Sequence, residues 1–488
     1  MQPAADAKAC HQRALALQQK GDRQAAAALF ERALAQDARF WPARFELGSL
    51  RLNGGAFEEA IRDFEAVLRL EPAHARSWLL LGVAWNGLSR ADRALDCFKQ
   101  ALKVDPAFGE AHYNCGVIQH GQGELEAAVA SNRLAIAHPP SPLMAYSNLG
   151  IALEALGDMQ GAAESYDAAI SADPNDPSAY WNKALLLLRQ GDDEAGWPLY
   201  EWRWAAGKAG VPVRHYTGRP LWFGGTSIEG RTILVHPEQG LGDVIQFARF
   251  VPMLAARGAR VVFEVFTPLF SLFHGLPGFG EVVGMGTGLP NFDLHCPLMS
   301  LPLALDMGIE TLPQDTPYIL PDPERVSTWR KRLGSSRRKR IGFVWKGNPK
   351  FPGNASRLVP LEQFQAIFGT AAEFLCAQKE LSAAEREILA AHKNVRLMGD
   401  DLADFGDTAA LLAHCDVVIT SDTSFAHLAG AMGKPTLLLL AAHADWRWLM
   451  ERADSPWYPT GLLFRQAEPG AWEDVISSVR ASLGEYLK

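Results

Sequence analysis

A 34-residue spacing of turn-forming residues runs through the first part of this 488-residue chain. Five glycines and one serine lie on it: Gly21, Gly55, Ser89, Gly123, Gly157 and Gly191. Prolines recur at the same spacing, at Pro72, Pro106, Pro140 and Pro174. A fixed period of this length indicates a repeat protein, in which each unit can bury its apolar face only against its neighbours. The chain should therefore begin with a stack of helical repeats rather than with a globular domain.

The third repeat shows how its helices should pack. Its pattern is Trp78, Leu81, Gly82 and Trp85, followed by Ala94, Phe98, Ala101 and Pro106. The small residues Gly82 and Ala94 let two helices approach closely, and the ring of Phe98 fills the groove between them. Proline then ends the second helix. This pattern resembles the tetratricopeptide repeat (TPR), and the resemblance implies an α-solenoid of about five and a half repeats over residues 1–205.

Three asparagines form a further series with the same spacing. Asn114, Asn148 and Asn182 stand on the first helix of successive repeats. A carboxamide offers both a donor and an acceptor, so such a row could bind the backbone of an extended peptide. The alternative is that each amide makes its hydrogen bonds within the solenoid. We expect these residues to bind an acceptor peptide on the concave surface.

Composition excludes several classes of protein. A net charge of −8 argues against a nucleic-acid partner, which would need clustered lysine and arginine. The six cysteines show no C-x-x-C pair, which favours reduced thiols over a disulfide framework or a zinc site. The apolar run at residues 436–442 is too short to span a bilayer, and the first residues lack an apolar signal core. We therefore expect a cytoplasmic protein without a membrane span.

The second half of the chain changes to an α/β pattern. After residues 207–230, which are rich in glycine and proline, "RTILVH" (231–236) and "ARVVFEVF" (259–266) flank a glycine turn and a helix that should reach Arg257. This order predicts a β-α-β unit with parallel strands. Other short strands are expected around "EVVGM", "FDLHC", "RIGFVW", "EFLCAQ", "DVVIT" and "PTLLLL". The pattern predicts two Rossmann-like domains, at residues 206–325 and 326–488, with a ligand at the carboxyl ends of their strands.

Four loops at those strand ends carry the residues that could do chemistry. They contain Gly240, Gly242 and Asp243; Lys346 and Asn348; Gln378 and Lys379; and Asp422, Thr423, Ser424 and His427. In the last loop, free backbone N–H groups, hydroxyl groups and a helix dipole converge, which favours a diphosphate. Lys346 could add a positive charge. The cleft loops have no D-x-D motif and no His/Cys cluster with ligand spacing, so we expect neither a metal nor a resident cofactor.

These loops resemble those of a known enzyme family. The strand–"GLGD"–helix opening and the segment "SDTSFAHLAGAMGKP" resemble the ADP-heptose:lipopolysaccharide heptosyltransferases, which have the GT-B fold. The joining of TPR repeats to such a half resembles protein O-GlcNAc transferases and the TPR-type flagellin glycosyltransferases of bacteria. The resemblance implies transfer of a sugar from a nucleotide-sugar donor to a protein, with flagellin as one candidate. It also implies that Asp243 is the catalytic base, and that the loop at Asp422–Ser424 contacts the donor diphosphate. The other residues of the four loops would help to bind the donor.

Several alternatives stay open at this point. Asp243 could cap the helix that follows it, Lys346 could be a solvated lysine, and His427 could be structural. The segment "DWRWL", with Trp446, Arg447 and Trp448, could border the nucleotide, although core packing is favoured. The donor could be UDP-GlcNAc, ADP-heptose or a CMP-linked nonulosonic acid.

Two other functions compete with sugar transfer. A dinucleotide dehydrogenase would need a third glycine where Ile245 stands, even though Glu264 follows Gly242 at a suitable distance. The stronger alternative is a non-catalytic TPR scaffold whose degenerate glycosyltransferase half binds a nucleotide without turnover.

Overall fold

The computed structural model describes residues 2–139, 142–212, 216, 218–348 and 357–487. By its internal contacts the chain divides into two compact units, Met1–Asn182 and Lys183–Lys488. Each unit is described by itself. None of the described helices is both long and apolar enough to cross a membrane.

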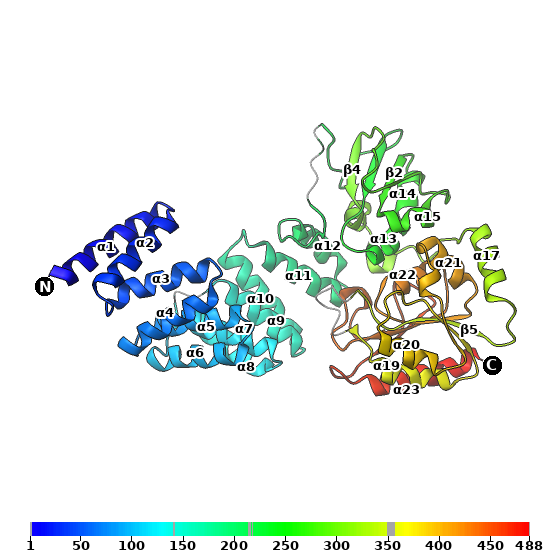
Figure 1. Ribbon diagram of the computed structural model, residues 1–488. Coiled ribbons are helices and arrows are strands. Elements are labelled where there is room, and N and C mark those ends of the chain that lie inside the picture. The colour runs from blue at the N-terminus through cyan, green and yellow to red at the C-terminus, as the bar shows by residue number, and fades with distance from the viewer. Residues whose placement is uncertain (1, 140–141, 213–215, 217, 349–356, 488) are drawn as a thin grey trace. The chain divides into compact units, whose positions relative to one another are not determined.

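The first unit consists of helices that lie side by side in pairs (Figure 1). They are α1 (Gln2–Gln19), α2 (Arg23–Gln36), α3 (Trp41–Asn53), α4 (Phe57–Leu70), α5 (Ala75–Gly87), α6 (Ala91–Val104), α7 (Gly109–Gly121), α8 (Leu125–Ala137), α9 (Met144–Ala155) and α10 (Met159–Ala172). Helix α11 (Pro177–Gln190) crosses into the second unit, where α12 (Asp193–Tyr200) completes a sixth pair. The predicted solenoid is confirmed.

The turn inside each pair explains the 34-residue spacing. The five glycines of the series have φ between 78° and 85°, and Ser89 has φ 58°. This left-handed conformation costs glycine nothing but strains most other residues, so the turn selects glycine at the same place in almost every repeat.

A second set of glycines sets the distance between the paired helices. A Cβ atom on Gly82 would overlap the ring of Phe98, and one on Gly150 would overlap Tyr166. The two aromatic side chains are buried, each 1% exposed. The predicted close approach at Gly82 is therefore confirmed, and it recurs along the solenoid.

The second unit contains two parallel sheets. The first has the strand order β3-β2-β1-β4, and the second has the order β10-β9-β8-β5-β6-β7. The strands of the first are β1 (Thr232–His236), β2 (Arg260–Val265), β3 (Glu281–Gly284) and β4 (Leu294–Pro297). Those of the second are β5 (Arg340–Val344), β6 (Glu373–Cys376), β7 (Val395–Leu397), β8 (Val417–Ser421), β9 (Thr436–Leu440) and β10 (Gly461–Arg465). The predicted pair of α/β sheets is confirmed.

Helices connect these strands, and one more helix, α23, follows the last strand. The first sheet has α13 (Leu241–Phe247), α14 (Val251–Ala256), α15 (Phe270–Phe273) and α16 (Leu301–Leu305). The second has α17 (Pro323–Leu333), α19 (Leu361–Phe364), α20 (Ala383–Ala390), α21 (Phe405–Ala413), α22 (Ser424–Ala431) and α23 (Trp472–Tyr486). The single helix expected after the glycine turn is instead α13 and α14, joined by a 3-10 turn at Ala248–Phe250. Pro252 lacks the N–H that would bond to Ala248, which explains the break.

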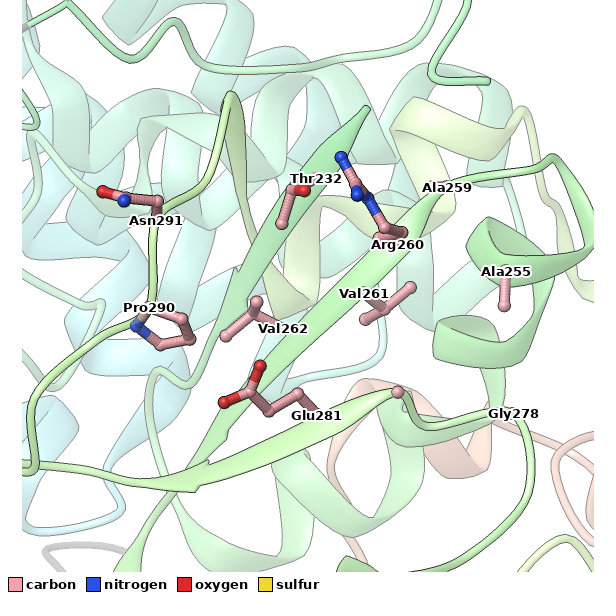
Figure 2. A pocket seen from close by; sticks show the side chains of 11 residues that line it. Thr232, Ala255, Ala259, Arg260, Val261, Val262, Gly278, Glu281, Pro290 and Asn291 are labelled. Carbon is pink, nitrogen blue, oxygen red and sulfur yellow. The ribbon is translucent and has the colours of Figure 1, made fainter. Parts of the chain in front are cut away.

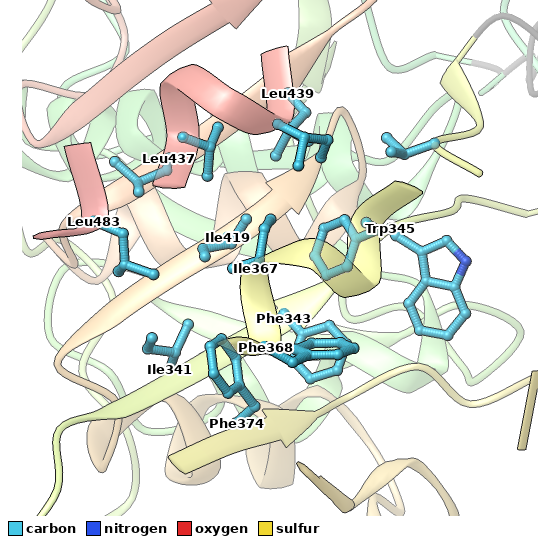
Figure 3. Packing of buried hydrophobic residues seen from close by; sticks show 14 of the residues in the cluster. Ile341, Phe343, Trp345, Ile367, Phe368, Phe374, Ile419, Leu437, Leu439 and Leu483 are labelled. Atoms are coloured by element: carbon cyan, nitrogen blue, oxygen red, sulfur yellow. The ribbon is translucent and has the colours of Figure 1, made fainter. Parts of the chain in front are cut away.

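The core of the second sheet is aromatic. Phe343 on β5 contacts Phe364, Phe368 and Phe374, with ring centroids 5.1 to 6.1 Å apart. Figure 3 shows the rings of Phe343, Phe368 and Phe374 beside aliphatic side chains from β8, β9 and α23. This packing fixes the central strands, and so fixes the loops that leave their carboxyl ends.

Candidate functional site

The topology of the second sheet brings two of the four predicted loops together. Strand β5 lies between β6 and β8, because the chain first builds β6 and β7 on one side and then crosses to β8 on the other. Val344 at the end of β5 pairs with Thr420 of β8. The loops with Lys346 and with Asp422 therefore leave adjacent strands, at the switch point where open α/β sheets bind ligands.

Helix α22 begins in the second of these loops. Thr423 is the N-cap residue, but its side chain makes no capping hydrogen bond, and its hydroxyl lies 3.3 Å from that of Thr420. Thr423 and Ser424 are half-buried, and Asp422 is 7% exposed. The start of α22 thus keeps the positive end of a helix dipole without a side-chain cap from Thr423, which favours an anion.

Lys346 already has a partner. Its Nζ lies 2.6 and 2.7 Å from the two carboxylate oxygens of Glu385 on α20. Burial alone would raise the pKa of Glu385, but Lys346 and the hydrogen bonds from Ser382 together outweigh it, and the pKa is lowered. Lys346 is therefore a paired cation rather than a solvated loop lysine.

The third loop is held by other parts of the same sheet. Lys379 donates from Nζ to the carbonyl oxygen of Leu402 at 2.8 Å. The backbone carbonyl of Gln378 packs so closely on Gly399 that a Cβ there would overlap it. Asn348 is exposed, at the end of a described segment. Among the described residues, Lys346 thus binds Glu385 and Lys379 binds Leu402, rather than the start of α22.

The glycine turn of the first sheet, in contrast, contacts α22 directly. A Cβ on Gly242 would lie 2.8 Å from Cδ2 of His427 and 3.4 Å from Cα of Ser424. The absence of a side chain at Gly242 lets α13 and α22 approach each other at their starts. The structure thereby brings Gly242 together with two residues of the fourth loop.

His427 is enclosed at this contact. It is 5% exposed, its Nδ1 lies 2.9 Å from the hydroxyl of Tyr458, and its ring stacks on Trp448 with centroids 5.5 Å apart. Burial, assisted by the nearby charge of Arg447, lowers the pKa of His427 to about 3. The imidazole is therefore neutral at physiological pH.

Asp243 lies at the end of the same turn, and both its oxygens are used. Oδ2 accepts a hydrogen bond from the backbone N–H of Gly240 at 2.6 Å, and Oδ1 accepts one from Nη2 of Arg447. The side chain is 19% exposed. Burial raises the pKa of Asp243, whereas Arg447 and the Gly240 N–H oppose the rise. Asp243 thus does cap the start of its helix, and it keeps an exposed edge as well.

Arg447 is a site residue that the sequence analysis named only as part of "DWRWL", for which it favoured core packing over a role at the site. Its guanidinium also bonds to Oδ1 of Asp445 at 2.8 Å and to Oε1 of Gln246 at 2.6 Å, and it lies 4.4 Å from the ring of Trp446. Trp446 and Trp448 are buried. An arginine between two core tryptophans needs carboxylate partners, and that requirement is the signal that could have identified it.

The charged groups continue from Asp445 to the start of α22. Arg357 lies 3.6 Å from Asp445 and 3.4 Å from Asp422. Burial raises the pKa of Asp422, which Arg357 opposes. Burial would also raise the pKa of Asp445, but Arg447 and Arg357 outweigh it and lower that pKa. Alternating carboxylates and guanidiniums therefore join the glycine turn to the loop before α22.

Glu238, on the same turn as Asp243, is unsuited to proton transfer. It is 0% exposed, and its two oxygens lie 2.6 and 2.8 Å from Nε and Nη2 of Arg203. The backbone N–H of Met299 donates to it at 3.0 Å. Because these bonds enclose the carboxylate, Glu238 cannot replace Asp243 as a base that faces an acceptor.

All three asparagines of the series lie in the first unit, and Asn182 is the last residue of that unit. All three side chains are half-buried on first helices of their pairs. Asn114 donates from Nδ2 to the carbonyl of Glu110, one turn earlier, at 2.7 Å. One of its N–H groups is thus used within the helix.

A separate hollow lies at the first sheet. Figure 2 shows it at the amino ends of β1, β2 and β3, where Thr232, Arg260 and Glu281 line it, with a volume of about 730 Å³. Ligands of open α/β sheets bind at the opposite, carboxyl edge. We therefore place the candidate site at Asp243 and α22. Within the described ranges, no group of three or more His, Cys, Asp or Glu side chains could hold a metal ion.

Comparisons with known proteins match two separate parts of the chain. A tetratricopeptide repeat model matches residues 11–63, 45–95, 87–145 and 147–201. A model of glycosyltransferase family 9 (heptosyltransferase) matches residues 362–459, which include β8, α22 and the Trp446–Trp448 turn but not Asp243. The chain therefore combines TPR repeats with a heptosyltransferase-like segment, as its sequence predicts.

One curated relative is Protein FlbA of Caulobacter vibrioides. It is 26% identical over 318 residues, which are 60% of this chain and 52% of FlbA. The chain thus spans about half the length of the curated relative it matches.

Three solved structures are similar to a part of this chain. YrrB, a TPR protein with an unusual peptide-binding site, is 23% identical, covers 36% of this chain and 91% of its own, and has a TM-score of 0.32. A thermophilic TPR protein of Thermus thermophilus, TTC0263, is 23% identical, covers 37% and 99%, and has a TM-score of 0.31. MamA is 22% identical, covers 33% and 95%, and has a TM-score of 0.31.

Proposed function

We propose that this chain is a nucleotide-sugar-dependent glycosyltransferase of the GT-B type that modifies a protein held by its TPR solenoid. One observation carries the proposal. The family 9 match includes the strand, the helix and the charged turn that meet at the switch point of the second sheet, and Asp243 contacts that same turn. A donor at the start of α22 would therefore lie beside a carboxylate.

The start of α22 is suited to the phosphates of the donor. Backbone N–H groups and the helix dipole favour an anion there. Lys346 leaves the neighbouring strand and would exchange Glu385 for phosphate oxygens. The donor contacts predicted for Gly240, Gly242, Asn348, Gln378, Lys379 and His427 stay predictions.

The proposed reaction needs one proton acceptor. The acceptor hydroxyl oxygen forms a bond to the anomeric carbon, the bond from that carbon to the donor phosphate breaks, and the nucleotide leaves with the electron pair. The hydroxyl proton passes to Asp243. Burial favours this role because it raises the pKa of the carboxyl toward the range of a useful base.

The acceptor is proposed to be a protein, with flagellin as one candidate. Asn114, Asn148 and Asn182 would bind its backbone through the amide groups that the helices do not use. The donor remains one of three: UDP-GlcNAc, ADP-heptose or a CMP-linked nonulosonic acid. No metal and no cofactor are part of the proposed reaction.

A non-catalytic scaffold is the second candidate. It is favoured by the ion pairs of Lys346 with Glu385 and of Asp243 with Arg447, which leave neither candidate residue without a charged partner. Release of free nucleotide from a donor sugar in the presence of a protein acceptor would exclude it.

Thermal shift with ADP, UDP, GDP and CMP, and with their sugar conjugates, tests the donor site. A ligand at 100 times its Kd should stabilise the protein by about 2.7 kcal/mol. We expect one nucleotide class to do so, with or without EDTA.

A matched pair of variants then tests Lys346. Lys346→Ala should weaken binding of that nucleotide, whereas Glu385→Gln should strengthen it, because the ammonium no longer has to leave a carboxylate. If both variants lower the melting temperature equally and leave the affinity unchanged, the pair is only structural and the donor site is wrongly placed.

A further inference from the structure

Arg447 joins the two sheets of the second unit at a single carboxylate. It lies on the 3-10 turn Trp446–Trp448, which follows β9 of the second sheet, whereas Asp243 lies on α13 after β1 of the first. The two residues are 204 positions apart in the sequence and form an ion pair. Asp243 thus owes one of its two bonds to the other sheet.

The guanidinium is held on every side. Asp445 accepts from Nη1, Gln246 accepts from Nε, and Asp243 accepts from Nη2. The ring of Trp446 lies 4.4 Å from the guanidinium carbon, and the arginine side chain is only 7% exposed. The planar fork of arginine can make these bonds in fixed directions, which the single ammonium of lysine cannot. Arg447 is therefore a rigid donor rather than a mobile surface charge.

The carboxylate of Asp243 is held at both of its oxygens. The backbone N–H of Gly240 donates a hydrogen bond to Oδ2, and Arg447 donates one to Oδ1. We propose that Arg447 is a positioning residue for Asp243, so that the carboxylate is oriented toward an acceptor only while the two sheets are packed together. This inference rests on the proposed function, because it assigns the orientation of the proposed base.

The electrostatic surroundings of Asp243 support this role. Burial opposes its ionisation, and Arg447 is the largest influence in the other direction. The other charged or titratable groups that face it are Asp445 on the same turn as Arg447, Arg357 before α19, and Tyr200 on α12. Neutral His427 lies nearby on α22. Removal of Arg447 should therefore raise the pKa of Asp243 further.

The first test needs no substrate. Asp445→Asn serves as the background, so that loss of Arg447 does not leave a second unpaired carboxylate. An acid whose folded-state pKa is raised binds more protons folded than unfolded, so its contribution to stability falls as pH rises. Arg447→Gln should therefore lower the melting temperature more at pH 8 than at pH 5, by about 3 °C for one pKa unit. Adding Asp243→Asn should remove the part of this difference that comes from Asp243 and leave the part from Asp422, whose pKa Arg447 also lowers.

The second test measures sugar transfer from the nucleotide sugar that gives the thermal shift. In the same background, Arg447→Gln should move the acid side of the pH profile up by about one pH unit. Arg447→Lys keeps the positive charge, so it should restore the pH dependence of transfer. The rate of transfer should still be about 10²-fold below that with arginine, because lysine lacks the planar guanidinium that orients Asp243. Arg452→Gln is the control, because Arg452 forms an exposed pair with Asp454. It should change neither measurement.

The outcomes separate the inference from the proposed function. If the pH dependence of the melting temperature is the same with Asp or Asn at position 243, Arg447 does not act on Asp243 and the inference is overturned. If Asp243→Asn transfers sugar at the normal rate, the assignment of the base is wrong, even where the thermal coupling is present.

Discussion

At the scale of single residues, burial decides which chemistry each group of the site can perform. Gly242 brings α13 against His427, which is enclosed by Tyr458 and Trp448. A buried imidazole gains no water on protonation, so it stays neutral where an exposed histidine would be charged. The contact that builds the site therefore also buries an imidazole, and this buried imidazole should make the folded protein less stable in acid.

We predict that His427 lowers the stability of the protein in mild acid. Its pKa is lowered to about 3, so between pH 6.5 and 3 the unfolded chain binds a proton that the folded chain does not. From pH 6.5 to pH 5 this should cost about 2 kcal/mol. The glutamine of His427→Gln can still bond to Tyr458. Its free energy of unfolding should fall by about 2 kcal/mol less than that of the wild type between pH 6.5 and pH 5, as measured by urea unfolding at both pH values. His274→Gln, at an exposed position, is the control. Equal acid sensitivity of the wild type and His427→Gln would mean that the imidazole is not enclosed in solution.

At the scale of elements, the helix pairs repeat one packing solution with a single exception. Phe30, Phe64, Phe98 and Tyr166 occupy equivalent buried positions on the second helices of their pairs, where α8 has Asn132. Asn132 is 1% exposed and donates to Ala128, but its Oδ1 has no hydrogen-bond partner among the described residues. A buried polar atom without a partner destabilises its surroundings.

We predict that Asn132→Phe stabilises the solenoid. It removes the unpaired oxygen, worth about 1–3 kcal/mol, and adds the ring that the neighbouring pairs contain opposite a glycine. The melting temperature of the full chain should rise by several degrees. The reciprocal change, Phe98→Asn, should lower it, because it places the same defect in α6. A lower melting temperature for Asn132→Phe would show that α7 and α8 leave no room for the ring.

At the scale of the whole molecule, the segment that follows Asn182 is part of the unit that contains the two sheets, because its contacts are with that unit. Arg203 forms the fully buried pair with Glu238, Tyr200 lies 3.1 Å from Nε2 of Gln239, and Trp197 packs edge-on against Trp446. Loss of one partner from a buried ion pair leaves an unpaired charge and costs about 3–5 kcal/mol. The end of the last repeat is thus part of the fold that carries the site.

We predict that the two ways of removing the solenoid differ. Deletion of residues 1–176 keeps α11 and α12 whole and should leave a folded protein that binds nucleotide but no longer modifies a protein acceptor. Deletion of residues 1–205 also removes Arg203, and the resulting protein should have a melting temperature many degrees below that of the first deletion variant. Circular dichroism and the nucleotide thermal shift measure the first difference, and transfer to the protein acceptor measures the second. Normal transfer by the shorter chain would end the role of the solenoid in acceptor capture.

The sequence by itself determined the parts of this protein that depend on short-range geometry. The left-handed turns at Gly21 and its equivalents recur because each helix pair needs the same backbone conformation. The longer strands were predictable because both faces of a parallel sheet are buried and read as apolar runs. The strands β7 and β10 escaped prediction, since β7 is short and both lie at the edges of their sheet, where burial marks the sequence weakly.

Only the tertiary structure decided which of the predicted site residues meet. Gly242 meets His427 and Ser424 of α22, whereas Lys346 pairs with Glu385. Arg447 meets Asp243 across 204 residues of sequence. Such pairs leave no periodic pattern, because a charge is placed by the packing of whole sheets and not by its neighbours along the chain. The energy of a charge depends on burial and on a partner a few ångströms away, and folding is what supplies both.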